Sequence, residues 1–493
     1  MPEATPRDIL DDVIGLRERV STWGAATFRH WRPRIRNPDF AAGALNLAHY
    51  LAFRKHDLRS LQRALMPLGI SSLGRSEGRV LASLDAVVSA LSRLDGQRPR
   101  HVLRPPSRRQ FYRGERRLER ATDALFGPGL ENRHGRILAT LGSDAARDPD
   151  LLRRLAECGA DGVRINCAHD DPDRWARMIE NLRAAERATG RRIKILMDLA
   201  GPKVRTTEVA TPADRERMVV GDHLLICRAG ALRDPAYAFQ TGCTLPIVLE
   251  RLKVGDPVAV DDGKLRGRIV GEVGGNLLAS IEQAPVKGVK LKPEKGLNFP
   301  GVKLGLDPLT AKDLADLDFV AAHADLVGYS FVESARHVAC LQEELARRRP
   351  DWQRLALVPK IETGRAVVNL PEIMVQAAGR QPLAVMIARG DLAVELGFER
   401  VAEMQEEILW LCEAAHVPVI WATEVLDGLV RKGMPSRGEM TDAAMAARAE
   451  CIMLNKGPNQ LAGIEVLDNL LRRMGEHQAK KTPLLRELHS WAV

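Results

Sequence analysis

The stretch LALVPKIETGRAVVNLPEIMVQAAGRQPLAVMIARGD, residues 355–391, sets the fold class. It contains two short apolar runs, Leu355–Ile361 and Leu383–Ala388, and the segment between them has the apolar spacing of a helix. Short apolar runs separated by one helix are typical of a parallel βαβ unit, in which both strands are buried. Each run also ends in charged residues, which places polar groups at the carboxyl ends of the predicted strands.

The same alternation continues on both sides of this stretch. The predicted strands are Arg136–Leu141, Gly162–Asn166, Ile193–Asp198, Ala324–Tyr329, Leu355–Ile361, Leu383–Ala388, Val417–Ala422 and Cys451–Leu454. Eight strand–helix repeats predict an α/β protein with a closed (β/α)₈ TIM barrel, and in such barrels the active site lies at the carboxyl ends of the strands.

The barrel pattern is interrupted once and preceded by a different kind of sequence. Repeated Gly-Asp and Gly-Gly turns with short strand-like runs, such as Val258–Val260 and Arg266–Val273, predict a small inserted β domain. Apolar spacing of three and four residues in Ile9–Val20 and Leu81–Leu94 predicts a mainly helical N-terminal segment. The predicted domains are an extension at 1–130, the barrel at 131–206 and 293–480, the insert at 207–292 and a tail at 481–493.

Composition excludes several classes of protein. The chain has 493 residues, of which 45% are hydrophobic and 28% charged, as in ordinary soluble domains. We find no N-terminal apolar signal and no apolar run of 18 residues, so we predict a cytoplasmic protein without a membrane partner. The seven cysteines form no CxxC pair, which disfavours a structural zinc site and a disulfide framework.

The positive charge is concentrated at the front of the chain. The net charge is +9, and residues 1–130 hold 23 Lys and Arg against 13 Asp and Glu. Arginine-rich solvated helices are commoner than nucleic-acid sites, and we identify no aromatic interleaving of the single-strand-binding kind, so a nucleic-acid partner is not expected. Packing on the barrel or docking between subunits is the expected role of the extension, and a homo-oligomer is left open.

The residues at the predicted strand ends are suited to phosphate chemistry. Glu362 and Asp391 offer hard oxygen ligands for Mg²⁺, which keeps several positions for water and substrate oxygens. Arg164 and Arg205 have planar guanidinium groups that match phosphoryl oxygens, and Lys360 shares a strand face with Glu362. The set therefore predicts transfer of a phosphoryl group beside a divalent cation.

Each of these signals has an ordinary structural explanation when taken alone. An isolated Lys-x-Glu is usually a solvated strand edge, and Ala-Arg-Gly-Asp is most often a turn. Gly390 can serve loop geometry as well as ligand approach, and His169 alone is more often a capping or otherwise satisfied polar residue. Their occurrence together at successive strand ends favours a site.

The motifs at these strand ends resemble those of the pyruvate kinase family, from about Arg136 to about Met474. The matching blocks are RILATLG at 136–142, RINCAH at 164–169, GPKVRT at 201–206, VDDG at 260–263, KGLNFPG at 295–301, DPLTAKD at 307–313, PKIE at 359–362, MIARGDLAVE at 386–395, WATEVL at 421–426, PSRGE at 435–439 and CIML at 451–454. The resemblance implies a Mg²⁺- or Mn²⁺-dependent phosphotransferase that converts phosphoenolpyruvate and ADP to pyruvate and ATP.

The resemblance also implies roles for single residues. Arg164, Lys360 and Thr423 would be catalytic: Arg164 would contact the phosphate of phosphoenolpyruvate, Lys360 would assist phosphoryl transfer, and Thr423 would lie near the enolate carbon. Glu362 and Asp391 would hold the metal. The remaining implied positions are the substrate-carboxylate cradle Arg389, Gly390 and Asp391, the nucleotide contacts Asn166, His169, Arg205 and Lys295, and the lid residue Asp262.

Several positions depart from the family pattern. Ala168 and Leu199 replace a Ser and a Thr of the monovalent-cation site, and Lys203 stands where potassium-independent members carry Lys, so K⁺ is not expected to be required. Ala200 replaces a Lys, and Asn455–Pro458 replaces Ser-Gly-Glu-Thr on the rim. The chain also ends soon after the eighth predicted helix, so regulation through the family's C-terminal domain is not expected.

Two alternative functions remain open from the sequence. The first is a catalytically silent protein that senses phosphoenolpyruvate or a nucleotide, which Ala200 and Asn455–Pro458 motivate. The second is a metal-dependent lyase or aldolase of the related phosphoenolpyruvate/pyruvate barrels. The insert and KGLNFPG argue against the lyase. The retained residues Lys360, Glu362, Asp391 and Thr423 argue against the sensor.

Overall fold

The predicted TIM barrel is confirmed. The computed structural model describes residues 5–95, 104–228 and 230–484, so most of the predicted tail, 485–493, lies outside the described residues. Eight parallel strands close in the order β1-β17-β16-β15-β14-β13-β3-β2. These strands are β1 Arg136–Thr140, β2 Gly162–Asn166, β3 Lys194–Asp198, β13 Leu326–Tyr329, β14 Ala356–Ile361, β15 Val385–Ala388, β16 Val419–Ala422 and β17 Cys451–Leu454.

Helices surround the barrel and separate its strands. They are α7 Pro149–Glu157, α8 Pro172–Thr189, α9 Ala311–His323, α10 Ala335–Arg348, α11 Gly364–Val368, α12 Leu370–Ala378, α13 Arg389–Leu396, α14 Phe398–Ala415, α15 Asp427–Lys432, α16 Arg437–Ala446 and α17 Gln460–Gly475. Strands such as β15, β16 and β17 are buried at every position, which explains their nearly unbroken apolar sequence. Within the described residues, no helix is both long and apolar enough to span a bilayer.

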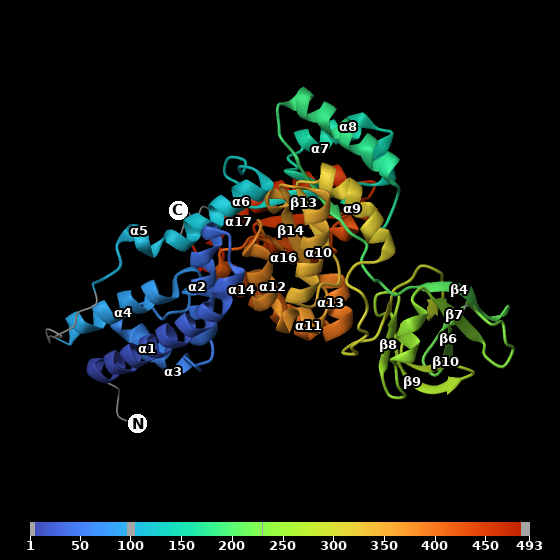
Figure 1. Ribbon diagram of the computed structural model, residues 1–493, viewed down its shortest axis with the longest axis horizontal. Coiled ribbons are helices and arrows are strands. Elements are labelled where there is room, and N and C mark those ends of the chain that lie inside the picture. Colours follow the sequence, from blue (N-terminus) through green and yellow to red (C-terminus); the bar gives the residue numbers. More distant parts are fainter. Residues whose placement is uncertain (1–4, 96–103, 229, 485–493) are drawn as a thin grey trace, which may run out of the picture.

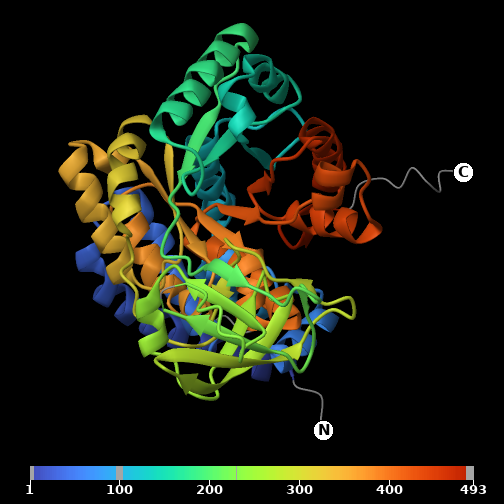
Figure 2. The same cartoon turned by 90° about the vertical axis from the view of Figure 1, so that its right-hand side faces the viewer.

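The insert forms a separate β body with its own core. Seven of its strands pair in the order β12-β8-β9-β10-β6-β7-β4, and β5 pairs with β11. Its strands are β4 Thr206–Ala210, β5 Arg217–Met218, β6 His223–Cys227, β7 Phe239–Cys243, β8 Pro257–Val260, β9 Leu265–Val273, β10 Asn276–Gln283, β11 Val289–Lys290 and β12 Leu297–Asn298. Figure 1 shows this insert at the right of the barrel and the extension at the left. In Figure 2, viewed from the insert's side, the blue extension helices lie behind.

The N-terminal segment is helical, as predicted, and packs on the barrel. Its helices are α1 Pro6–Trp31, α2 Pro38–Phe53, α3 Arg59–Leu65, α4 Val80–Leu94, α5 Arg108–Phe111 and α6 Arg113–Phe126. The Trp31 indole N–H donates to Glu372 of α12 at 2.7 Å, and Arg34 pairs with the same carboxylate at 2.6 Å. α2 approaches α14 so closely that a Cβ at Gly43 would lie 2.3 Å from the carbonyl oxygen of Ala415. Only glycine fits there.

The last helix of the extension closes the amino end of the barrel. Leu125 and Phe126, at the end of α6, are 4% and 3% exposed. They belong to the same apolar cluster as inward-facing strand residues such as Met386 and Met453. Burying two large apolar side chains contributes about 1.5–3 kcal/mol each. The extension is therefore part of the barrel's core rather than a free arm.

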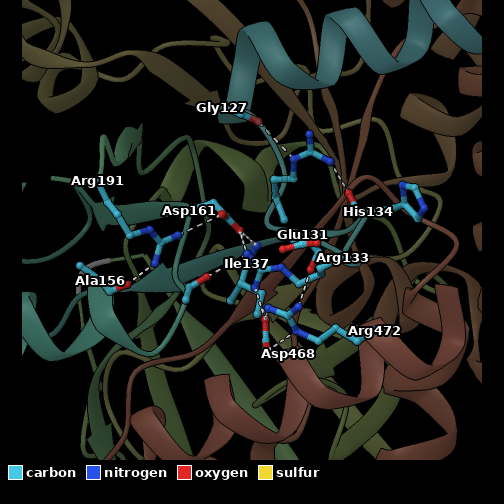
Figure 3. Close-up of polar contacts among 12 residues, drawn as sticks. Gly127, Glu131, Arg133, His134, Ile137, Ala156, Asp161, Arg191, Asp468 and Arg472 are labelled. Carbon is cyan, nitrogen blue, oxygen red and sulfur yellow. Dashed lines mark hydrogen bonds and ion pairs between the residues drawn. The ribbon is translucent and has the colours of Figure 1, made fainter. Parts of the chain in front are cut away.

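A buried ionic cluster joins the beginning of the barrel to its last helix (Figure 3). Arg133 precedes β1, and its side chain is fully buried between Asp161, before β2, at 2.6 Å and Asp468 of α17 at 3.0 Å. Asp161 also accepts the backbone N–H of Ile137 at 2.8 Å, and Arg191 lies 3.4 Å away. Burial lowers the pKa of Arg133 and raises the pKa of Asp161, and the attraction between them opposes both shifts. The cluster depends on both partners remaining charged.

We expect Arg133→Met to lower the free energy of unfolding by about 3–5 kcal/mol, because it leaves the Asp161 carboxylate buried without its main partner. The double variant Arg133→Met, Asp161→Asn should lose less, because the amide still accepts from Ile137 without a charge. Urea unfolding followed by tryptophan fluorescence measures both. The control Arg153→Met, on the surface of α7, should change stability by less than about 1 kcal/mol. A double variant no more stable than Arg133→Met would contradict this account.

Candidate active site

The ends of β2, β3 and β14 bring two predicted cations onto one buried carboxylate. Arg164 Nε donates to Asp198 Oδ2 at 2.8 Å, and Lys360 Nζ lies 3.4 Å from the same oxygen. The parallel pairing of β2 with β3 places Arg164 two residue pairs from Asp198 in register. Asp198 is fully buried, and its Oδ1 atom has no hydrogen-bond partner among the described residues. Asp198 therefore fixes the two cations that face the mouth of the barrel.

Lys360 is the centre of this group. Its Nζ atom lies 3.1 Å from Glu362 Oε1 and 2.9 Å from the hydroxyl of Ser330. Burial disfavours the charged ammonium, but Asp198 and Glu362 outweigh it and raise the pKa of Lys360. Lys360 therefore remains a cation across the physiological pH range, as charge neutralisation of a phosphoryl group requires.

The two predicted metal ligands are neighbours. Burial raises the pKa of Glu362, with Lys360 opposing the shift and the nearby Asp391 carboxylate adding to it. The second oxygen of Glu362 accepts the Phe331 N–H at 2.6 Å. Lys203 Nζ bonds both oxygens of Asp391, at 2.7 and 3.0 Å. The sequence predicted both Lys203 and Asp391 at this rim, and the structure pairs them directly.

This pair of carboxylates fits a divalent cation of the magnesium type. Two neighbouring, mutually repelling carboxylates are stabilised by a cation between them, and hard oxygen ligands suit Mg²⁺. Within the described residues, no group of three or more His, Cys, Asp and Glu side chains has the arrangement of a metal site. The ion would therefore draw its other ligands from water and substrate, and Glu362 and Asp391 would hold it.

A strained turn positions Thr423 beside the start of α13. Thr423 and Glu424 have φ of +66° and +59°, in a backbone region that residues other than glycine rarely adopt. The Thr423 hydroxyl accepts the Gly390 N–H at 2.8 Å and donates to the Ala422 carbonyl. The guanidinium of Arg389 holds this turn, because it donates to the carbonyls of Ala422 and Thr423.

Arg389 is itself held by Asp442 of α16, with Nη2 2.9 Å from Oδ2, and by the Trp421 ring, whose centre lies 4.8 Å from the guanidinium. Arg389, Gly390 and Asp391 form the first turn of α13, where backbone N–H groups have no partner within the helix and favour an anion; that of Gly390 donates to Thr423. Gly390 has open space on its exposed side, since Thr423 is the nearest group to its missing Cβ, at 3.8 Å. The three residues predicted as a carboxylate cradle are thus brought together with Thr423.

The four predicted nucleotide contacts are less concentrated. Burial lowers the pKa of His169, and the nearby cations Lys456 and Arg205 lower it further, so these three basic groups face one region. Arg205 donates to the Glu294 carbonyl at 3.1 Å. The Asn166 side chain accepts the Ala168 N–H, an ordinary turn contact, and Lys295 pairs with Asp261 of the insert at 3.0 Å.

The insert reaches the site through two segments. Lys203 Cε and Asp262 Oδ1 both lie within 4 Å of the position that a Cβ on Gly296 would occupy. Arg266 of β9 donates to the carbonyls of Ala393 and Val394 at the end of α13, at 3.3 and 3.4 Å. The predicted lid residue Asp262 is therefore next to Lys203, and the insert contacts the helix that begins at the site.

Sequence reasoning assigned no role to Asp198, Asp442 or Arg266. Asp198 ends a predicted strand, and a carboxylate at that place beside Arg164 is a signal that could have been used. Asp442 contacts Arg389, and Arg266 contacts α13. In both cases the partner is far away in the sequence, so no local sequence pattern predicts the contact.

The fold and these contacts define a TIM-barrel protein with a cluster of lysine, arginine and carboxylate side chains at its strand ends. The family model for the barrel domain of pyruvate kinase matches residues 132–459 of this chain. The chain belongs to the pyruvate kinase family.

Curated relatives agree with this assignment. The chain is 32% identical over 359 residues to a pyruvate kinase of Mycobacterium tuberculosis, covering 71% of this chain and 72% of the relative. It is 33% identical over 317 residues to the pyruvate kinase of Geobacillus stearothermophilus, covering 64% of this chain and 51% of the relative. It is 31% identical over 330 residues to the human pyruvate kinase PKLR, covering 65% and 55%. The chain thus spans about half the length of two of these relatives.

We expect Asp442→Asn to loosen the turn that holds Thr423, because Arg389 loses its charged partner. Amide hydrogen exchange in residues 422–426 and at Gly390 should accelerate about tenfold or more. Hydrogen-exchange mass spectrometry measures this. The control Glu403→Gln, which removes an exposed ion pair on α14, should leave these amides unchanged. Equal protection in Asp442→Asn and the wild-type protein would show that Arg389 does not need Asp442.

Proposed function

We propose that this protein transfers the phosphoryl group of phosphoenolpyruvate to ADP, giving pyruvate and ATP in the cytoplasm, as in glycolysis. One observation carries the proposal. Lys360 is a half-buried cation held by Asp198, Glu362 and Ser330, and Arg164 binds the same Asp198. Two fixed cations at the barrel mouth can neutralise the negative charge on a phosphoryl group while it is transferred.

The transfer needs alignment and charge neutralisation more than covalent chemistry, because its transition state is loose. In our proposal Arg164 binds the phosphoryl oxygens of phosphoenolpyruvate, and Lys360 stabilises the charge as the bond to the enolate oxygen breaks. The bond to the terminal oxygen of ADP forms at the same phosphorus. A divalent ion held by Glu362 and Asp391 would supply further positive charge to the oxygens of substrate and phosphoryl group.

The enolate that remains must gain a proton. The first turn of α13, Arg389–Asp391, would hold its carboxylate through its backbone N–H groups, with that of Gly390 shared between the carboxylate and the Thr423 hydroxyl. Thr423 is adjacent, because its hydroxyl accepts from Gly390. We propose that this hydroxyl directs a proton taken up from solvent to the enolate carbon, which forms the C–H bond of pyruvate.

The insert, 207–292, is proposed as a lid that excludes water from the phosphoryl group. Its contacts through Arg266 on α13 and Asp262 near Lys203 support this role. Asn166, His169, Arg205 and Lys295 are proposed to bind the nucleotide. We also propose the domain division predicted above, with the extension at 1–130 and the barrel on both sides of the lid.

A catalytically silent sensor remains the second candidate. Lys203 bonds both oxygens of Asp391, the carboxylate proposed to bind the metal, and this observation favours it. For catalysis, Lys203 must share Asp391 with the ion. The sensor would bind phosphoenolpyruvate without turnover.

Lys360→Met should lower kcat for pyruvate formation from phosphoenolpyruvate and ADP with Mg²⁺ by about 10²–10³-fold, since it removes the central cation. A coupled pyruvate assay measures this, beside the control Lys253→Met, an exposed lysine of the insert that should retain full activity. Wild-type protein that binds phosphoenolpyruvate in calorimetry without turnover would favour the sensor. Equal activity in Lys360→Met would overturn the proposed role of Lys360.

We expect activity without potassium. The ammonium of Lys203 lies at the rim beside Asp391 and Phe331, and supplies a fixed monovalent charge there. Replacing KCl by tetramethylammonium chloride at equal ionic strength should change kcat/KM by less than about twofold, measured in the same assay. Strong activation by K⁺ would contradict this expectation.

A further inference from the structure

The two helices before the barrel carry a dense group of arginines. We call Arg108, Arg109, Arg113, Arg116, Arg117 and Arg120, on α5 and α6, the arginine surface. All are exposed except Arg117, which is half-buried. On α6 their spacing of three and four residues places Arg113, Arg116, Arg117 and Arg120 along one side of the helix. Four of the like charges are therefore confined to one helical face.

In the part of the chain that the structure describes, no carboxylate lies within ion-pair distance of these arginines. Within the described residues, none of the six guanidinium groups forms an ion pair within 4 Å; Arg116 and Arg120 bond backbone carbonyls instead. The contrast with α7 and α8 is clear, because Arg153, Arg154 and Arg174 there each pair with a carboxylate close by in the sequence.

The charge on this surface is not neutralised by its own helix. Of the acidic residues on α6, Glu115 pairs with Arg79 and Asp123 with Arg136, which leaves Glu119. Burial lowers the pKa of Arg117, and repulsion from Arg113 and Arg120 adds to the shift, with Asp39 opposing it. Folding leaves the arginine surface strongly positive. Binding of an anionic partner would therefore stabilise it.

The arginine surface also includes a hollow and two aromatic side chains. The chain bends at Tyr112 between α5 and α6, and an open hollow of about 510 Å³ is lined by Arg108, Arg109, Tyr112 and Arg116. Tyr112 is 39% exposed, with its ring edge-on to Phe111 at 5.2 Å. Arg79 lies over both rings, 4.5 and 5.4 Å from their centres, and orients them. Sequence interpretation passed over these two aromatic residues within the arginine run.

The hollow lies on a rigid support. The opposite side of α6 is buried, with Leu118, Leu125 and Phe126 at most 8% exposed, and the last two pack into the barrel. α5 and α6 lie on the far side of the barrel from the insert in Figure 1, so a partner here would leave the mouth of the barrel open.

We propose that the arginine surface binds single-stranded nucleic acid, with arginines on successive phosphates and Tyr112 stacking on a base. Guanidinium groups match phosphate oxygens in pairs, and base–aromatic stacking is tolerant of sequence. A stacking ring favours a single strand over a duplex, because the bases of a duplex are stacked on one another and are not free to stack on Tyr112. Anionic membranes fit less well, because no large apolar side chain accompanies the arginines on the outer face of α6 to enter the lipid.

Fluorescence anisotropy with a labelled 12-nucleotide oligouridine RNA tests the proposal on the full chain. Arg109→Gln, Arg113→Gln, Arg116→Gln combined should weaken binding at least tenfold at 50 mM salt, and the slope of log Kd against log salt should fall by about 0.7 for each phosphate that the variant no longer neutralises. Tyr112→Ala should weaken binding about tenfold without changing that slope. The control Arg153→Gln, Arg154→Gln, Arg174→Gln removes equal charge from α7 and α8 and should bind like the wild type.

Four results would overturn the proposal. The first is that wild-type protein does not bind the RNA at 50 mM salt, and the second is that the control variant weakens binding as much as the arginine variant does. The third is that a 12-base-pair duplex binds more tightly than the single-stranded RNA. The fourth is that the arginine variant loses binding to anionic vesicles while its RNA binding stays intact. Circular dichroism melting of each variant, with a midpoint near that of the wild type, ensures that a loss of binding reports the surface rather than unfolding. If the arginine variant melts early, Tyr112→Ala and the salt slope of the wild type decide the question.

Discussion

The parallel pairing of β1 with β17 is the constraint on which the other features depend. It joins the first and last strands of the barrel, with Arg136 opposite Cys451 and Ala139 opposite Leu454, and so brings all eight carboxyl ends to one rim. Because neighbouring strands are in parallel register, Arg164 and Lys360 come from distant segments to lie within 4 Å of the Asp198 carboxylate. The Arg133 cluster secures the same closure at the opposite end, where it ties the start of β1 to α17.

The rim is organised as alternating charges. Arg164 and Lys360 share Asp198, Lys360 also contacts Glu362, and Lys203 contacts Asp391. In the protein alone these charges compensate one another, so three buried or half-buried cations are kept in place without substrate. Under the proposed function, the phosphate of the ligand would take over part of the role of these carboxylates, and the divalent ion would take over part of the role of the ammonium groups. The charged rim would then be stable without ligand and still bind charged ligands.

Sequence patterns were sufficient for the fold and for part of the site. The strands are buried on both sides, so their apolar runs stand out, and all eight were placed to within two residues. Lys360, Glu362, Asp391 and Thr423 lie at the ends of those runs, so the barrel topology alone brings them together. Asp442 and Arg133 could not be found this way, because their roles arise from packing between segments far apart in the chain. The plugging of the barrel by α6 was equally hidden, since Leu125 and Phe126 have the pattern of any amphipathic helix end.

The position of α6 has a consequence for how the chain is made. Leu125 and Phe126 leave the ribosome before any barrel strand, yet the apolar cluster they join includes Cys451 and Met453 of the final strand. Their burial is therefore complete only after β17 has been translated, and until then part of this apolar end is open to solvent or to a chaperone. A helix that precedes every barrel strand thus reaches its full native surroundings only with the last of them, so the extension and the barrel complete their folding together.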